Sequence, residues 1–174
     1  MKILIIYGST EGQTKKIAGF LKDQSEKLGH QVSLADANDE PPTPAGYDLV
    51  FIGASIHMHK YQNAVLHYVK SHVEALNKIP TAFFSVSLAA ASGDAESLEE
   101  LLEITNAFLK ETGWIPSHVE QVAGALLYTK YDFFKKLIMR LIAKRSGGNT
   151  DTSSDHEYTD WDTLNAFLEK ILKI

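Results

Sequence analysis

Hydroxyl, amide and glycine residues are concentrated near the start of the chain, in the segment Gly8-Ser9-Thr10-Glu11-Gly12-Gln13-Thr14. The two glycines allow the backbone to pass close to a bound group, and Ser9, Thr10 and Thr14 supply hydroxyl donors. Such neutral donors suit a phosphate monoester when the segment also opens a helix, whose first N–H groups lack partners within the helix. A helix cap made of Ser and Thr, with no ligand, is the alternative interpretation.

This segment lacks the signatures of two common nucleotide-binding loops. Lys15 and Lys16 do not follow Gly12 in the Gly-Lys-Ser/Thr order that binds a triphosphate, and the Gly-x-Gly-x-x-Gly fingerprint of dinucleotide binding is absent. Since the segment contains no cation, backbone amides and hydroxyls would have to bind the negative charge.

Metal and thiol chemistry find little support in the sequence. The chain has no cysteine, which excludes disulfides, Cys-ligated zinc, iron–sulfur clusters and thiol nucleophiles. His57 and His59 lie two residues apart, but no third ligand lies near them, so we predict no metal site. The other histidines are predicted to lie at the surface or at the ends of elements: His30, His67, His72, His118 and His156.

Strands and helices must position these residues, and the apolar pattern predicts both. Short apolar runs predict five strands, over Lys2–Tyr7, Gln31–Asp36, Asp48–Ala54, Thr81–Val86 and His118–Ala125. Helical periodicity predicts four helices, over Gln13–Leu28, Asn63–Leu76, Glu96–Thr112 and Asp160–Ile174. We expect Gly29 and Gly113 to end two of the helices and Thr159 to cap the last one. The link from Ala37 to Gly46, with its three prolines, predicts a loop. This alternation predicts an α/β fold with a doubly wound, five-stranded parallel sheet and helices on both faces.

Length and charge restrict the organisation and the partners. The 174 residues, 44% of them hydrophobic, predict a single domain over residues 1–174. The apolar run at the N-terminus is too short for a signal peptide, and no run could span a bilayer, so we expect an intracellular protein. A net charge of −5 argues against nucleic acid as the main partner.

An insertion is expected after the fifth strand, over about residues 126–158. Connections in such folds usually have about 2 to 6 residues. Residues 130–145 contain six basic and one acidic residue and carry +5, so the rest of the chain carries −10. Tyr131–Arg145 has the pattern of an amphipathic helix, which could lie on a membrane surface or pack on the domain with its basic face in solvent.

The motifs resemble those of a known family. The first strand followed by Ser-Thr-x-Gly-x-Thr is similar to the FMN phosphate loop of flavodoxins. A closer resemblance is to the menaquinone-dependent protoporphyrinogen IX dehydrogenases, flavodoxin-like enzymes of bacterial haem biosynthesis. The segments that carry this resemblance are 48–56, 82–88, 123–126, the basic insertion, 146–152 and 158–161.

The resemblance implies FMN as cofactor and a set of residues around it. The phosphate would bind at Ser9, Thr10, Glu11, Gly12, Gln13 and Thr14. The ring would lie between two loops that contain Ala54, Ser55, Ile56 and His57, and Ser87, Leu88, Ala89 and Ala90. Because these loops offer no aromatic side chain to cover the ring, a flat organic substrate could stack there. His57 could exchange a proton near the ring, but no catalytic acid or base can be named.

The implied reaction is the oxidation of protoporphyrinogen IX to protoporphyrin IX in three two-electron steps, with electrons passed to menaquinone or ubiquinone. Tyr128, Tyr131, Lys135, Lys136 and Arg140 are then candidates for contact with the substrate propionates or an anionic membrane. We expect a cytoplasmic protein, peripherally associated with the inner face of the cell membrane, and a possible homo-oligomer.

Three alternatives remain at this point. A flavodoxin-type electron carrier would have no substrate of its own. An NAD(P)H:quinone reductase would take electrons directly from a nicotinamide. A regulatory module with the same fold would have lost its cofactor altogether.

Overall fold

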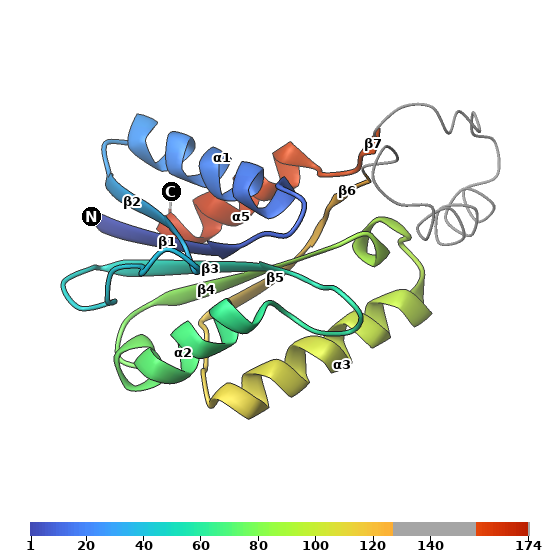
Figure 1. The fold of residues 1–174 in the computed structure, drawn as a ribbon. Helices are drawn as coiled ribbons and strands as arrows, with labels where there is room; N and C mark the ends of the chain where they lie inside the picture. The colour runs from blue at the N-terminus through green and yellow to red at the C-terminus, as the bar shows by residue number, and fades with distance from the viewer. Residues whose placement is uncertain (127–155, 174) are drawn as a thin grey trace.

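A five-stranded parallel sheet forms the centre of the computed structural model, which describes residues 1–126 and 156–173 (Figure 1). Its strands are β1 (Lys2–Gly8), β2 (Gln31–Asp36), β3 (Leu49–Ser55), β4 (Thr81–Ser87) and β5 (His118–Ala123). They lie in the order β2-β1-β3-β4-β5, and every neighbouring pair is parallel. The five strands predicted from the apolar runs are therefore confirmed, with small differences at their ends.

In the described residues, four α-helices cover the two faces of this sheet (Figure 1). They are α1 (Gln13–Lys27), α2 (Asn63–Leu76), α3 (Ala95–Thr112) and α5 (Trp161–Leu172). Side chains of β1 alternate between the faces: Ile3 and Ile5 pack with α1 and α5, whereas Leu4 and Ile6 pack with α2 and α3. Both clusters are buried, as expected for a parallel sheet covered on both faces. The doubly wound α/β prediction is confirmed.

Strand register brings the carboxyl ends of four strands to one edge. Gly8 lies beside Ala54, Ser55 lies beside Val86, and Ser87 lies beside Ala123. The loops that follow β1, β3 and β4 therefore start next to one another. In open α/β sheets this edge is the usual position of a ligand.

Helix ends agree with the sequence prediction in two places and differ in one. Gly29 and Gly113 adopt the left-handed conformation after α1 and α3, with φ of 84° and 70°. Thr159 was expected to cap the last helix, but this prediction is wrong. Asp160 is the N-cap, and its carboxylate accepts the N–H of Thr163 at 2.9 Å. The Thr159 hydroxyl is buried and donates instead to the carbonyl of Ala123 at 2.7 Å, so it is not available as a cap.

The segment after β5 also differs from the expectation. A single strand was expected to continue to Ala125, but β5 ends at Ala123 and Gly124 lies between β5 and the next strand. Beyond it, β6 (Ala125–Leu126) pairs antiparallel with β7 (His156–Glu157). This two-residue ladder joins the ends of the predicted insertion, while the predicted insertion helix at 131–145 lies outside the described residues.

Two further expectations concern the loops and the membrane. Residues 37–46 form the predicted loop without a helix. Among the helices in residues 1–126 and 156–173, none is long and apolar enough to cross a membrane.

Replacing the N-cap of α3, Asp94, with alanine is expected to lower the free energy of unfolding by about 1 kcal/mol. The Asp94 carboxylate accepts the N–H of Ser97 at 3.0 Å, a donor that the helix itself cannot pair. Urea denaturation measures the change. Asp94→Asn keeps an oxygen acceptor and should retain most of the stability; a loss as large as that of Asp94→Ala would contradict a capping role.

Candidate functional site at the carboxyl edge of the sheet

The loop between β1 and α1 presents an uncapped helix N-terminus. Ser9 Oγ accepts the N–H of Gly12 at 2.9 Å, which closes the loop on itself. Gly12 has a φ of 97°, and a Cβ placed there would meet no atom within 4 Å, so the surface beside it is open. Gly12 is the N-cap residue of α1, and no side-chain cap hydrogen bond is formed there within the described residues. The N–H groups of the first turn therefore favour an anion.

Thr14 supplies the most informative atom of this loop. The residue is 1% exposed, and its Oγ1 finds no hydrogen-bond partner among the described residues. Buried hydroxyls are nearly always paired, because an unpaired one loses its bonds to water without replacement. An anionic oxygen bound at the start of α1 would supply the missing partner. The orphan hydroxyl, the open glycine and the uncapped helix together fit a phosphate group.

Gln62 connects this loop to the end of β3. Its Nε2 donates to Thr10 Oγ1 at 3.2 Å and to Ser55 Oγ, and its Oε1 accepts the N–H of Ser55 at 3.2 Å. Gly8 permits the close approach, since a Cβ there would lie 2.5 Å from a methyl of Val65. The sequence prediction did not include Gln62, because its position before α2 says nothing about a partner 52 residues away.

The loop after β3 forms a tight turn beside the candidate site. Ile56 N–H bonds to the carbonyl of Val86 at 2.9 Å, which ties this loop to β4. His57 and Lys60 exchange two backbone hydrogen bonds, and Met58 and His59 between them both have positive φ. His59 Nδ1 lies 3.0 Å from a carboxylate oxygen of Glu100 on α3. No group of three or more metal-ligating side chains occurs in the parts of the chain described here.

The loop after β4 is small and mostly apolar. Ser87 Oγ accepts the N–H of Ala90 at 3.1 Å, and Ala89–Ala91 form a single 3₁₀ turn. Leu88, Ala89 and Ala90 are half-buried, so part of their surface remains open to a ligand. The carbonyl of Ser87 also accepts the N–H of Gly124, which joins this loop to the end of β5.

Tyr61, the first aromatic residue after the β3 loop, lies in the core. It is 8% exposed, and its hydroxyl contacts Ser85 Oγ at 2.8 Å and Thr105 Oγ1 at 2.9 Å. Burial raises the pKa of Tyr61 above its ordinary value, so this phenol stays protonated at neutral pH. Tyr61 is therefore not positioned to stack on a ligand at the sheet edge.

The predicted site residues divide into three groups. The first group, from Ser9 to Thr14, Ala54 to His57 and Ser87 to Ala90, lies at or just beyond the carboxyl ends of β1, β3 and β4, which meet at one edge. Gln13 differs from the rest, because its side-chain amide is bound to Glu157 and Thr159 and leaves its backbone N–H for a ligand. Five predicted residues lie outside the described residues: Tyr128, Tyr131, Lys135, Lys136 and Arg140.

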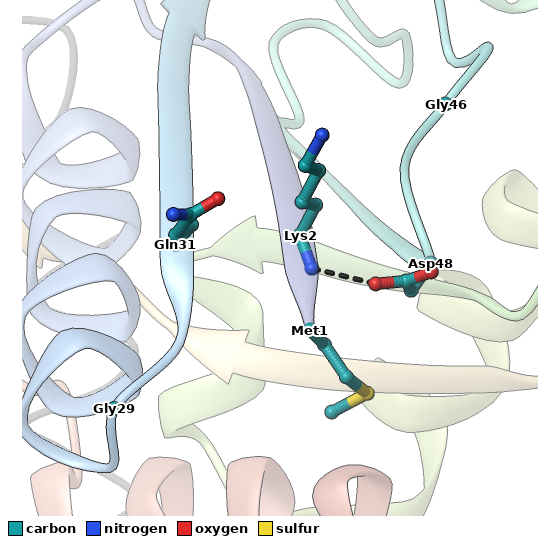
Figure 2. Close-up of a pocket in the computed structure, with 6 residues that line it drawn as sticks. All are labelled: Met1, Lys2, Gly29, Gln31, Gly46 and Asp48. Carbon is teal, nitrogen blue, oxygen red and sulfur yellow. Dashed lines mark hydrogen bonds between the residues drawn. The ribbon is translucent and has the colours of Figure 1, made fainter.

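A separate pocket lies at the opposite edge of the sheet, beside the amino ends of β1 and β2 (Figure 2). It is lined by Met1, Lys2, Gly29, Gln31, Gly46 and Asp48. The Asp48 carboxylate in this pocket accepts the backbone N–H of Lys2 at 2.7 Å. It therefore already has a structural role at the start of β1. Because ligands of parallel sheets bind at the carboxyl edge, we assign no function to this pocket.

Comparisons with known proteins agree with this geometry. A family model described as a flavodoxin domain matches residues 4–153. The chain is 37% identical to a protoporphyrinogen IX dehydrogenase (quinone) of Escherichia coli K12, over 98% of this chain and 94% of the relative. It is 36% identical to a protein of that name from Leishmania major, over 95% of this chain and 72% of the relative. Among solved structures, oxidised flavodoxin 1 from Bacillus cereus aligns with a TM-score of 0.59 at 15% identity, over 99% of this chain and 98% of that chain.

Proposed function

The chain belongs to the flavodoxin domain family and, within it, to the protoporphyrinogen IX dehydrogenases (quinone), and we propose that it oxidises protoporphyrinogen IX with bound FMN and passes the electrons to a quinone. One observation carries the cofactor assignment. The buried Thr14 hydroxyl, which has no partner within residues 1–126 and 156–173, lies at a helix N-terminus, where the phosphate of FMN would complete its hydrogen bonding.

The phosphate would be held without a formal positive charge from the loop. Ser9, Thr10 and Thr14 offer hydroxyls, and Gln13 offers its backbone N–H group at the start of α1, whereas the Gly12 N–H is already bonded to Ser9 Oγ. Gln62 holds Thr10 in place and fixes the distance between this loop and the end of β3. Riboflavin, which lacks the phosphate, should consequently bind much more weakly than FMN.

The ring would lie between the β3 and β4 loops, where it supplies two-electron transfer between the tetrapyrrole and the quinone. Ile56, Leu88, Ala89 and Ala90 give this place a small apolar lining, and their backbone amides can orient the ring edge. Because Tyr61 is buried in the core and the two loops carry no other aromatic rings than those of His57 and His59, a flavin bound there would keep one face uncovered by them for a flat substrate. This openness favours an enzyme over a flavodoxin-type carrier.

Contact with the membrane belongs to the same proposal. The quinone is a lipid-soluble acceptor, and the basic segment at 130–145 is the part of the sequence suited to anionic headgroups or to substrate propionates. Charge reversal at Lys135, Lys136 and Arg140 is therefore expected to lower binding to anionic liposomes and quinone-coupled turnover several-fold, with the FMN content unchanged. Equal liposome partitioning by the variant would contradict the membrane contact.

Steady-state turnover tests the function. Under anaerobic conditions, protein reconstituted with FMN should form more protoporphyrin from protoporphyrinogen IX than its bound FMN alone could oxidise only when a menaquinone or ubiquinone analogue is present. Direct reduction of the bound flavin by NADH would instead identify an NAD(P)H:quinone reductase. Reduction by a partner reductase, with no tetrapyrrole oxidised, would identify a carrier. A purified protein that does not take up added FMN would contradict every redox function.

A further inference from the structure

Side-chain contacts join the start of α1 to the ladder formed by β6 and β7. Gln13, the first residue of α1, donates its side-chain amide to Glu157 Oε1 at 2.7 Å and to Thr159 Oγ1 at 2.8 Å. Glu157 is one of the two residues of β7, and Thr159 follows two positions later. These residues are separated by 144 and 146 positions in the sequence, so only the fold brings them together.

The second half of this connection runs from β7 to the β4 loop. Thr159 donates to the carbonyl of Ala123, and the N–H of Tyr158 bonds to the carbonyl of Gly124 at 3.0 Å. The N–H of Gly124 in turn bonds to the carbonyl of Ser87 at 2.9 Å. The start of the phosphate-binding helix and the loop proposed to hold the ring are therefore both attached to the β6–β7 ladder.

Glu157 is the charged member of this connection. Lys16 Nζ donates to its Oε1 at 2.6 Å and lies 5.3 Å from the centre of the Trp161 ring. The hydrogen bond from Lys16, assisted by that from Gln13, lowers the pKa of Glu157, so the carboxylate remains ionised at neutral pH. The exposed ion pair with Lys16 contributes little to the stability of the fold. The hydrogen bond that Glu157 accepts from Gln13 orients the Gln13 side chain, and this is the role that matters here.

We propose that Glu157 is a positioning residue that couples FMN binding to the docking of the β6–β7 ladder. This inference rests on the proposed cofactor. Gln13 offers its backbone N–H to the phosphate and its side chain to Glu157. Each of these two contacts restricts the conformational freedom of Gln13 and so favours the other. When one contact has already ordered Gln13, the other contact forms without that entropic cost. FMN binding therefore strengthens the contact between Gln13 and Glu157, and by linkage that contact strengthens FMN binding equally.

The coupling has a consequence for the insertion. Residues 127–155 connect β6 to β7 in the chain, and they include the basic residues proposed to meet the substrate or the membrane. Loss of the cofactor would loosen the ladder from which that segment starts and to which it returns. FMN binding would thereby help to hold β6 and β7, the two strands that flank the insertion, in position.

The test combines FMN titration with amide hydrogen exchange on the full chain. Glu157→Ala should weaken FMN binding about 5-fold or more, the lower end of typical coupling between sites. FMN should slow exchange of the Tyr158 amide in the wild type and do so much less in Glu157→Ala. Glu157→Gln keeps an acceptor for Gln13 and should recover at least half of the lost affinity on a logarithmic scale.

Glu26→Ala is the matched control, because Glu26 forms a 2.6 Å ion pair with Lys22 near the other end of the same helix. It should change neither FMN affinity nor Tyr158 exchange by more than twofold. FMN affinity within twofold of wild type in Glu157→Ala, undiminished FMN protection of Tyr158 in that variant, or no recovery in Glu157→Gln would each overturn the coupling. The wild-type titration reports on the proposed cofactor independently, since its failure would remove FMN itself from the account.

Discussion

Replacing Thr14 with valine is expected to weaken FMN binding by about 10- to 150-fold while making the cofactor-free protein more stable. Hydrogen bonds to charged groups contribute about 1.5–3 kcal/mol, and about 1.4 kcal/mol corresponds to each tenfold change in affinity. Valine preserves the shape of threonine but cannot donate to a phosphate. The Thr14 hydroxyl is buried with no partner in the part of the chain that the structure describes, so its removal should raise the free energy of unfolding of the apoprotein by about 1 kcal/mol.

Fluorescence titration and urea denaturation of the apoprotein measure these opposite effects. Riboflavin affinity should be nearly unchanged by Thr14→Val, because riboflavin has no phosphate. Ser25→Ala is a suitable control: Ser25 is buried on the same helix, but its hydroxyl already donates to the carbonyl of Leu21 at 2.7 Å, and FMN affinity should stay within twofold. Equal losses for FMN and riboflavin in Thr14→Val would contradict a phosphate contact.

Replacing Gly53 with alanine is expected to destabilise the sheet by about 3 kcal/mol, the upper part of the usual range for overpacking. Gly53 lies in the middle of β3, and a Cβ there would approach two carbon atoms of the Phe84 ring to 1.9 Å. Phe84 is itself fully buried, so the ring cannot move without displacing the packed face formed with α1 and α5. Chemical denaturation of the apoprotein measures the loss.

A second substitution distinguishes this clash from a general weakening of the strand. Phe84→Leu in the Gly53→Ala background should restore part of the stability, so the two effects should be less than additive by about 1–3 kcal/mol. Gly19→Ala is a control of opposite sign, since a Cβ at Gly19 within α1 meets no atom and should stabilise the helix by about 0.5–1 kcal/mol. Full additivity of Gly53→Ala and Phe84→Leu would contradict direct contact as the cause.

The sheet and its helices were predictable because their signals are local. Continuous apolar runs such as residues 49–55 occur where a strand is covered on both faces, and Gly29 and Gly113 end helices through their own backbone freedom. The loop between β1 and α1 was predictable for the same reason, and its role in binding a phosphate stays a prediction. The resemblance identified the family and its reaction, which spacing alone could not do.

The missed features depend on contacts between distant segments. Nothing in the sequence distinguishes Gln62 from any other polar residue before a helix. Only its hydrogen bonds to Thr10 and Ser55 reveal its part in the site. Thr159 was a reasonable N-cap by residue type, but its burial against Ala123 left that task to Asp160. The β6–β7 ladder has two residues in each strand, too few to give a periodic signal. Glu157 was missed because its partners lie at the other end of the chain.

We propose a site in which neutral donors hold a phosphate at one end and small apolar loops leave room for a flat substrate at the other. The central claim is that FMN bound there takes electrons directly from protoporphyrinogen IX. Anaerobic titration of the FMN-loaded protein with protoporphyrinogen IX, without quinone, tests it most directly. The account predicts loss of the oxidised flavin absorption, with no more than one protoporphyrin formed for every three FMN reduced because the oxidation removes six electrons, and return of that absorption when a quinone is added. Unchanged flavin absorption at excess protoporphyrinogen IX, in a protein that binds FMN, would contradict the claim.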